Sequence, residues 1–384
     1  MTIDTKCPTI PEGKQTAIVQ QDVTNLAGQN GSIPLTISHD VPMPSPTVPA
    51  HSVLVRVLAV ALNPTDYKMP VHLPMPGTTT GCDFCGIVIK ASPEQEASFP
   101  AGTRVAGTTF AYNEARPLDG AFAQYTVGDA RLMVRVPPSW TDLEGAALGG
   151  VGWRTATLAL WDEEKLGLRS PSNPIEGEEQ PVLVYGGTTA TGTMAIQLLK
   201  LSGYRPIAIT SPASAYLAKQ YGAAATASYL SPSVAEDAQA AAGGKHKIRH
   251  ALDCITTAES AAMCFSTIAR RGGRYVCLEA LEDGWVTRQA VHTNVAMGYE
   301  TTGIDHDFGP SSPYTRLADP ALHERGVRWA AEVQALLDVG KLTHHPVREI
   351  KGGWDGIIKG LELLRRGKVS GEKLVVRIPQ DGSM

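Results

Sequence analysis

The sequence has neither a strong charge imbalance nor a long apolar run, and we expect no secretory leader. Over 384 residues the formal net charge is -4, so its electrostatics do not predict a nucleic-acid partner. No uncharged apolar run approaches the roughly 18 residues of a membrane span, and no basic segment followed by an apolar one opens the chain. We therefore expect a cytoplasmic, two-domain enzyme with no membrane or nucleic-acid partner.

Clustered metal ligands are also missing. Of the six cysteines, only Cys82 and Cys85 lie close together. A structural zinc site needs four ligands, and no second Cys or His pair stands at a suitable spacing. The pair runs into a predicted strand, whereas a thioredoxin-like redox pair opens a helix. We expect buried free thiols.

The stretch 181–222 carries the clearest pattern in the chain. An apolar run at 181–185 predicts a buried parallel strand, 193–202 predicts a helix ending before Gly203, and 206–210 predicts a second strand. This is a βαβ unit. Its turn reads Gly186-x-x-Thr189-x-x-Gly192, and the hydroxyls of Thr188, Thr189, Thr191 and Thr193 can donate to phosphate oxygens. The alternative is an ordinary tight turn with threonine N-caps.

Acidic residues are absent between Gly203 and Gly222, where an NAD site usually has one to bind the ribose hydroxyls. Ser211, Ser214 and Lys219 stand there instead. Hydroxyls and a cation suit a 2′-phosphate, so the pattern favours NADP over NAD. The alternative is that the serines cap a helix and that Lys219 is only solvated.

The rest of the chain divides into unlike halves. Short β segments at 16–20, 53–62, 86–90, 104–107, 121–127 and 131–136 predict an antiparallel, barrel-like half, followed by a helical stretch at 140–161. Further strands are predicted at 224–229, 248–254 and 274–278. The tail predicts helices at 320–339 and 354–366 and a strand at 374–378.

This arrangement resembles the medium-chain dehydrogenase/reductase superfamily over essentially the whole chain. The motifs are Asn63-Pro64-Thr65-Asp66, the run 77–86, the turn YGGTTATGT and the tail 367–376. The resemblance implies an α/β fold. A GroES-like β-barrel domain for substrate and catalysis would comprise 1–160 and 305–384, and a Rossmann doubly wound parallel sheet that binds NADP would comprise 161–304.

Zinc alcohol dehydrogenases of this superfamily carry a Cys-His pair where this chain has Asn63-Pro64, and Gly-His-Glu where it has Gly81-Cys82-Asp83. Asn and Pro cannot replace a thiolate and an imidazole as zinc ligands. The chain is therefore similar to the zinc-free quinone- and enoyl-reductase branch, and we expect no zinc.

Within that branch the chain resembles fungal trans-acting enoyl reductases, on the segments 184–191, 201–204, 251–256 and 370–377. These enzymes serve a polyketide synthase, or a hybrid synthase, whose own reductase domain is silent. The resemblance implies NADPH-dependent reduction of an α,β-unsaturated acyl thioester on an acyl carrier protein, in secondary metabolism. The alternatives are a free-standing quinone or enone reductase and a non-catalytic NADP-binding partner subunit.

The resemblance also implies site residues. The NADP contacts that it implies are Thr65, Asp66, Tyr67, Lys68, Thr188, Thr189, Ala190, Thr191, Ser211, Pro212, Ala213, Ser214, Tyr229, Leu278, Glu279, Val369 and Ser370. The residue patterns described above add Gly186 and Lys219. The substrate pocket would be formed by Leu148, Gly149, Gly150, Val151, Gly152, Trp153, Arg154, Thr155, Tyr299, Glu300, Thr301, Thr302 and Gly303.

Lys68 and Thr155 are the expected catalytic residues, which position and hydrogen-bond the thioester or the cofactor ribose. Thr155 is expected to open a helix; the alternatives are a solvated Lys68 and a Thr155 that only caps the helix. The α-proton would come from water or from a tyrosine such as Tyr67 or Tyr299. The loop 149–155 is a residue longer than usual, and its Trp153 and Arg154 are expected to reshape the acyl pocket.

Overall fold

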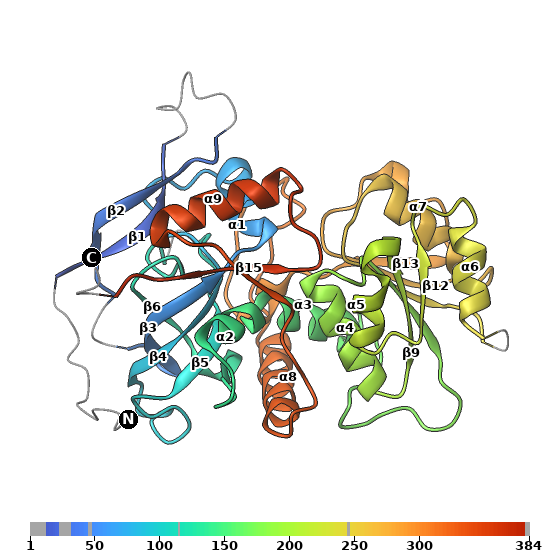
Figure 1. Cartoon of the computed structure of the whole chain (residues 1–384), viewed down its shortest axis with the longest axis horizontal. Coiled ribbons are helices and arrows are strands. Elements are labelled where there is room, and N and C mark those ends of the chain that lie inside the picture. The colour runs from blue at the N-terminus through green and yellow to red at the C-terminus, as the bar shows by residue number, and fades with distance from the viewer. Residues whose placement is uncertain (1–12, 23–31, 45–47, 114–115, 244–245, 381–384) are drawn as a thin grey trace. The chain divides into compact units, whose positions relative to one another are not determined.

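The computed structural model describes residues 13–22, 32–44, 48–113, 116–243 and 246–380. The chain folds into two compact units, the first made of Met1–Val151 and Val333–Met384 and the second of Gly152–Glu332. Each unit has a sheet of its own, and Figure 1 labels the elements. Helices α3 (Val151–Trp161) and α8 (Pro320–Asp338) each contain residues of both units. Cys7 lies outside the described residues.

The first unit is built on a mainly antiparallel sheet around β3 (Ser52–Ala61). The strand order is β14-β15-β3-β4-β5-β7; β6 also pairs with β3, and β1 pairs with β2 separately. Val55, Phe84 and Leu374, from three strands, are fully buried in its core. The other strands are β1 (Lys14–Gln20), β2 (Leu35–Pro42), β4 (Asp83–Ala91), β5 (Arg104–Thr108), β6 (Tyr125–Asp129), β7 (Val134–Arg135), β14 (Val347–Glu349) and β15 (Lys373–Arg377).

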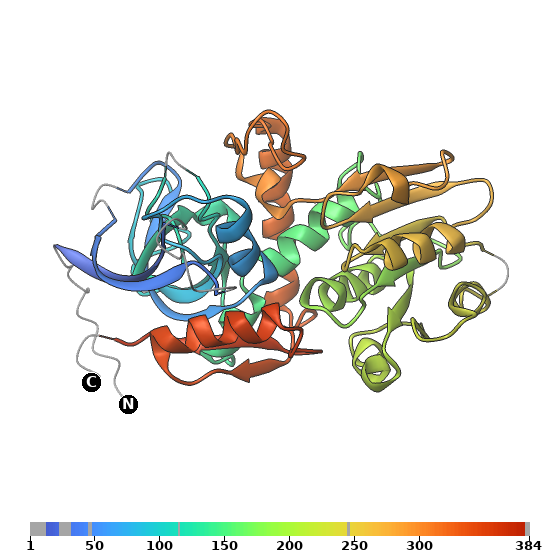
Figure 2. The same cartoon turned by 90° about the horizontal axis from the view of Figure 1, so that it is seen from above.

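Three α-helices of the first unit matter for the site: α1 (Pro64–His72), α2 (Asp142–Leu148) and α9 (Gly353–Arg365). A short 3-10 helix, η2 (Ala130–Leu132), precedes β7. Helix α9 buries Ile357 and Leu361, which lie four residues apart on one face. At Gly360 a Cβ would lie 2.4 Å from Leu62, so glycine lets the helix approach the core closely. Figures 1 and 2 both show α9 beside α1.

The second unit is an α/β unit with a parallel sheet in the order β10-β9-β8-β11-β12-β13. Leu183, Ile207 and Tyr275 are fully buried in it. Its strands are β8 (Pro181–Tyr185), β9 (Arg205–Thr210), β10 (Ala225–Ser228), β11 (His250–Asp253), β12 (Gly273–Cys277) and β13 (Val291–Val295). Its helices include α4 (Ala190–Leu201), α5 (Ala215–Gln220), α6 (Val234–Ala241), α7 (Ala258–Thr267), η3 (Pro212–Ser214), η4 (Asp283–Trp285) and η5 (Gly298–Thr302).

Some predicted boundaries were wrong. The helical stretch 140–161 is two helices, because Gly149 has a φ of +49°, in the left-handed region, and ends α2. The strand predicted at 121–127 begins only at Tyr125, and β2 was not predicted. The buried cysteines were predicted correctly for Cys82 and Cys85, which are free thiols. Within the described ranges, no helix has the length and apolar character needed to cross a bilayer.

Candidate functional site

The turn between β8 and α4 has a backbone that requires glycine. Gly186 has a φ of +71°, which glycine adopts without strain. A Cβ on Gly192 would lie 2.3 Å from the carbonyl oxygen of Gly186, closer than any real contact. The turn 186–189 is therefore tightly packed against the start of α4, and the first N–H groups of a helix are a site where anions bind. This geometry suits a phosphate group.

Two of the threonine hydroxyls predicted to bind phosphate, one in this turn and one in the first turn of α4, bond to nearby backbone groups instead. Thr189 caps α4: its Oγ1 accepts from the Gly192 N–H at 3.0 Å and donates to the Gly186 carbonyl at 2.9 Å. The Thr193 hydroxyl donates to the Ala190 carbonyl at 3.2 Å. Because each hydroxyl has one proton, Thr189 and Thr193 in this arrangement do not donate to a phosphate.

The residues after β9 lie next to this turn. Ser211 Oγ accepts from the Ser214 N–H at 3.2 Å, and the two serine hydroxyls are 2.7 Å apart. Thr188 Oγ1 donates to Ser214 Oγ at 3.3 Å, which joins the ends of β8 and β9. Lys219, in the last turn of α5, is exposed. Ser211 caps the short helix η3, as the alternative predicted, whereas Ser214 stands at the N-cap position of α5 and makes no side-chain capping bond there.

The other predicted cofactor residues of the second unit also follow the carboxyl ends of parallel strands. Tyr229 follows β10 and is 47% exposed, and its N–H donates to the Thr210 carbonyl. Leu278 follows β12, and Glu279 accepts from the Tyr314 hydroxyl at 3.2 Å. Chain order reverses at β8, whose neighbours are β9 and β11. Ligands of open α/β sheets bind at the carboxyl edge of such a switch point.

Asp253, at the end of β11, is a buried carboxylate that the sequence analysis did not single out. Its Oδ1 accepts from the N–H groups of Ile255 and Thr256 at 2.9 and 3.0 Å. Its Oδ2 accepts from Ser260 Oγ at 2.6 Å and from the Tyr275 hydroxyl at 2.8 Å. Asp253 thus fixes the loop after β11, at the same edge of the sheet. The sequence signal that could have indicated this role is an acidic residue at the end of an apolar strand.

In the first unit, Thr65, Asp66, Tyr67 and Lys68 form the first turns of α1. Asn63 is the N-cap, and its backbone N–H donates to Asp66 Oδ2 at 2.8 Å. Asp66 is fully buried, and burial raises the pKa of its carboxyl to about 7; the nearby Asp83 charge acts in the same direction. Asp66 therefore orders the start of α1 from inside the unit.

A second buried cluster, also not predicted, lies beside this cap. The Lys373 ammonium donates to Asn63 Oδ1 and, at 3.1 Å, to Asp83 Oδ2. Asn63 Nδ2 donates to the same Asp83 oxygen at 2.9 Å. The Lys373 and Asp83 side chains are 7% and 0% exposed, so this is a buried ion pair.

Asp83 also holds the junction between α2 and α3, where the predicted pocket residues lie: Leu148 ends α2, Gly149 and Gly150 connect the helices, and Val151 begins α3. Its Oδ1 accepts from the N–H groups of Gly150 and Val151, each at 2.8 Å. A Cβ on Gly149 would lie 2.4 Å from the Asp83 carboxyl carbon. Only glycine therefore allows the loop to pack on this carboxylate.

The remaining predicted residues of the first unit follow α9. Val369 packs against the core, and Ser370 is exposed. They stand just before β15, which begins with Lys373. Lys68 itself is half-buried.

Three expectations for residues 152–155 need correction. Helix α3 begins at Val151, so Thr155 lies inside it and neither opens nor caps it. Its Oγ1 would be 2.7 Å from a Cβ built on Gly298, so it faces the start of η5. Trp153 and Arg154 belong to the same helix, not to a loop, and are 1% and 4% exposed. Gly152 is buried as well.

Arg154 is bonded within the second unit. Its Nη2 donates to Thr301 Oγ1 at 2.7 Å and to the Gly298 carbonyl at 3.4 Å. The Thr302 hydroxyl donates to the Tyr299 carbonyl at 2.7 Å, and Gly303 ends η5 with a φ of +73°. The segment 298–303 is therefore held by α3 and by its own turns.

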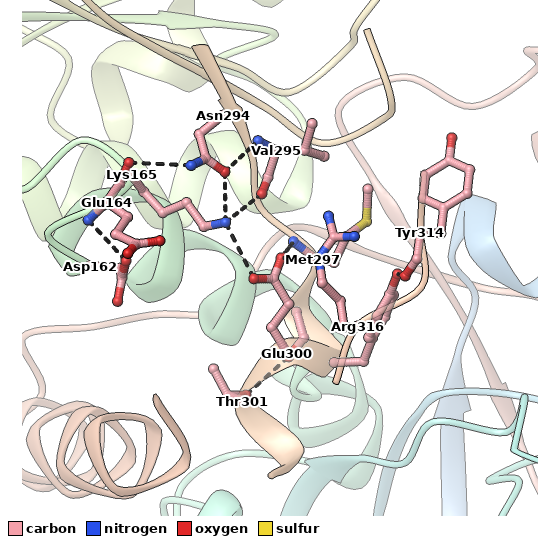
Figure 3. Close-up of polar contacts among 12 residues, drawn as sticks. Asp162, Glu164, Lys165, Asn294, Val295, Met297, Glu300, Thr301, Tyr314 and Arg316 are labelled. Carbon is pink, nitrogen blue, oxygen red and sulfur yellow. Dashed lines mark hydrogen bonds and ion pairs between the residues drawn. The ribbon is translucent and has the colours of Figure 1, made fainter. Parts of the chain in front are cut away.

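Glu300 anchors the same segment through the contacts drawn in Figure 3. Its Oε1 accepts from the Met297 N–H at 2.9 Å, and its Oε2 accepts from Lys165 Nζ at 3.2 Å. Lys165 also donates to Asn294 Oδ1 at 2.8 Å and to the Val295 carbonyl at 2.6 Å. Lys165 and Glu300 are 8% and 9% exposed, so the pair is buried. The Glu300 carboxylate supports η5 from inside the unit.

Comparison with known proteins identifies the family. Residues 49–138 match the family model for the alcohol dehydrogenase GroES-like domain. The trans-enoyl reductase calK of Penicillium decumbens is 51% identical over 375 residues, which cover 96% of this chain and 99% of calK. The chain belongs to the trans-enoyl reductases.

A second trans-enoyl reductase, sthE of Phaeosphaeria nodorum, is 49% identical over 370 residues, covering 96% of this chain and 99% of sthE. The crystal structure of the CurK enoyl reductase has a TM-score of 0.68 at 18% identity, over 95% of this chain and 100% of that one. At this identity the likeness concerns the fold alone. The predicted superfamily and the predicted fold class, with its GroES-like and Rossmann parts, are confirmed.

The residues of this trans-enoyl reductase fit a nicotinamide dinucleotide but not a zinc ion. The glycine turn before α4, at the switch point of a parallel sheet, fits a nicotinamide dinucleotide. The residues that stand in this chain where zinc alcohol dehydrogenases have their zinc ligands, 63–64 and 81–83, do not fit a zinc ion. Asn63 and Asp83 already bind the Lys373 ammonium, and burial raises the pKa of the Cys82 thiol, which opposes the thiolate that zinc needs.

Proposed function

We propose that the chain is a trans-acting enoyl reductase that uses NADPH to reduce the α,β-double bond of a polyketide intermediate. The intermediate would be an acyl thioester on the acyl carrier protein of a polyketide synthase or hybrid synthase. The observation that carries the proposal is the 51% identity, along 96% of the chain, to a protein named trans-enoyl reductase. We keep the cytoplasmic location and zinc independence as predictions.

The cofactor would supply a hydride from its nicotinamide ring. The chain would bind its phosphates at the β8–α4 turn and its 2′-phosphate near Ser211, Ser214 and Lys219, where no acidic side chain follows β9 before Gly222. Hydroxyls and a cation are the groups that favour a phosphate over a ribose hydroxyl. This supports NADPH over NADH.

The reaction places negative charge on the thioester oxygen after hydride reaches the β-carbon, and a positioned donor stabilises that oxygen. We propose that Lys68 on α1 is this donor and that Thr155 on α3 hydrogen-bonds substrate or cofactor ribose. For the α-proton, Tyr299 is disfavoured because its hydroxyl donates to the Tyr314 carbonyl at 2.7 Å and burial raises its pKa. Tyr67 and water remain the proposed sources.

The test is NADPH oxidation by the purified protein with an enoyl thioester, first free and then on the carrier protein, with the reduced product identified by mass. Lys68→Ala is expected to lower turnover by about 10- to 1000-fold while NADPH still binds, and Lys359→Ala, at an exposed position of α9, is the control. Turnover of quinones but not enoyl thioesters would favour the free-standing reductase. NADPH binding without turnover of any enoyl substrate would favour the partner subunit.

A further inference from the structure

Lys373 lies far along the chain from the residues that it contacts. Its Nζ donates to Asn63 Oδ1, 310 residues away, and to Asp83 Oδ2, 290 residues away. Asn63 caps α1, which carries Lys68, and Asp83 binds the loop before α3. One ammonium group therefore connects two segments that the proposed function places at the cofactor and the substrate.

The geometry points to Lys373 as a positioning residue: its buried ammonium fixes the cap of α1 and the loop 149–151 through Asn63 and Asp83. This inference rests on the proposed function for the roles of the two segments. Lys373 is not a catalytic residue, since it acts through the groups that it binds.

The contacts of Asp83 explain why a cation is needed here. Both carboxylate oxygens are used, Oδ1 by the N–H groups of Gly150 and Val151 and Oδ2 by Asn63 and Lys373. Asp83 has no exposed surface, so without the ammonium its charge would be buried and unbalanced. Either the carboxylate takes up a proton or it moves toward water, and each change alters the hydrogen bonds that hold the loop.

Asn63 transmits the same constraint to α1. Its side-chain oxygen accepts from Lys373, its Nδ2 donates to Asp83, and its backbone N–H donates to Asp66. The orientation of the amide is therefore set on both sides, and Asn63 is the N-cap residue directly before α1. A shift of this cap moves the first turn of the helix, which holds Thr65, Asp66, Tyr67 and Lys68.

The experiment separates positioning from stability with a pair of variants. Lys373→Met removes the ammonium alone, and the double variant Asp83→Asn/Lys373→Met removes both charges while the new amide oxygen can still accept from Gly150 and Val151. Removing both members of a buried ion pair leaves no unbalanced charge, so the double variant is expected to melt near the wild-type temperature. Lys351→Met, an exposed lysine of the same unit, is the matched control.

In the double variant the dissociation constant for NADPH is expected to rise about tenfold, and turnover of an enoyl thioester to fall by about 10- to 100-fold with a smaller change in KM. A stable double variant that binds NADPH with wild-type affinity would overturn the inference. If the wild-type protein reduces no enoyl substrate, the proposed function fails on its own, and the NADPH dissociation constants still decide the role of Lys373.

Discussion

The two units each bury one lysine against one carboxylate, in different surroundings. Lys373 meets Asp83 in the first unit, with side chains 7% and 0% exposed, and Lys165 meets Glu300 in the second, with 8% and 9% exposed. Both pairs hold a segment that the sequence analysis assigned to the substrate pocket. The two pairs differ in whether the carboxylate still has a positively charged partner after its lysine is removed.

Glu300 has a second cation, because Arg316 Nε lies 3.6 Å from its Oε1. Among the described residues, Asp83 has Lys373 as its ion-pair partner, and its other side-chain hydrogen bonds come from the neutral donors of Asn63, Gly150 and Val151. Although the two ion pairs are similarly buried, removing the lysine from each is therefore expected to change the free energy of unfolding by different amounts. Within the part of the chain that the structure describes, removal of Lys373 leaves the buried Asp83 carboxylate without a counter-ion, whereas removal of Lys165 leaves Glu300 with Arg316.

The largest expected effect is that of Lys373→Met on folding. Breaking a buried ion pair by removing one partner costs about 3–5 kcal/mol, because the remaining charge stays in the interior. The free energy of unfolding, from urea denaturation followed by circular dichroism, measures the loss. The control is Lys351→Met: the Lys351 side chain is 80% exposed and pairs with Glu349, so its removal should change the free energy of unfolding by less than about 1 kcal/mol. If Lys373→Met lost less than about 1 kcal/mol of unfolding free energy, the Asp83 carboxylate would not require a counter-ion for the protein to stay folded.

The next effect concerns Asp66, which also lies in the first unit. Its pKa is raised to about 7 from 3.8, so the native state keeps a proton that the unfolded state releases between these values. This contribution to stability is fully present below the unfolded pKa and is lost as pH rises through the native pKa. Asp66→Asn lacks the titration but keeps an oxygen for the Asn63 N–H.

The stability of Asp66→Asn relative to wild type should therefore increase by about 3 kcal/mol between pH 5 and pH 8, at 1.36 kcal/mol per pKa unit. Urea denaturation across this range is the measurement, and Asp355→Asn on the exposed side of α9 is the control. Parallel stability curves for wild type and Asp66→Asn would show that Asp66 does not titrate in this range.

The sequence predicted the parts of the molecule that depend on short-range pattern. The βαβ unit at 181–210 was visible because two apolar runs flank a helix-length segment with glycines in the turn. Thr188 and Ser214 could be expected to meet, because the carboxyl ends of adjacent parallel strands lie at one edge of a sheet. Their roles toward a cofactor remain predictions.

The sequence could not predict the buried ion pairs. Lys373 and Asp83 lie 290 residues apart, and Lys165 and Glu300 lie 135 apart, so neither pair forms a local pattern. In the sequence alone, a lysine in a polar segment that becomes buried cannot be distinguished from one that stays exposed to solvent. The misplacement of Thr155 has the same origin, since the start of α3 follows the loop whose N–H groups bind Asp83.

Lys219 differs from the two buried lysines, because it is exposed and its predicted role is to bind the cofactor, not to stabilise the fold. Lys219 lies on α5, near the Ser211–Ser214 turn. A charge-assisted contact to the 2′-phosphate is worth about 1.5–3 kcal/mol, so Lys219→Ala should weaken NADPH binding roughly ten- to a hundredfold and leave NADH binding nearly unchanged. Titration of intrinsic fluorescence with each cofactor measures this, and Lys200→Ala, exposed at the end of α4, is the control. Equal losses for both cofactors would assign Lys219 a structural role.

The smallest expected effect completes the comparison between the two buried pairs. Lys165→Met should cost about 1–3 kcal/mol of unfolding free energy, less than Lys373→Met, since a hydrogen bond to a charged group has about this net value. Two of the three groups that lose the Lys165 ammonium keep another partner: Glu300 retains the Met297 N–H and Arg316, and Asn294 Oδ1 retains the Val295 N–H at 2.8 Å. The third group is the Val295 carbonyl, whose bond to Lys165 is lost.

The same urea denaturation, with Lys165→Met and Lys373→Met measured side by side, tests the ranking. Adding Arg316→Met to Lys165→Met removes the second cation and should raise the cost toward that of Lys373→Met, because Glu300 then becomes a buried carboxylate without a counter-ion. Arg316→Met alone should cost less than the difference between the double and single variants. If Lys165→Met alone were as destabilising as Lys373→Met, the guanidinium at 3.6 Å would not compensate Glu300, and burial rather than a second cation would set the strength of both pairs.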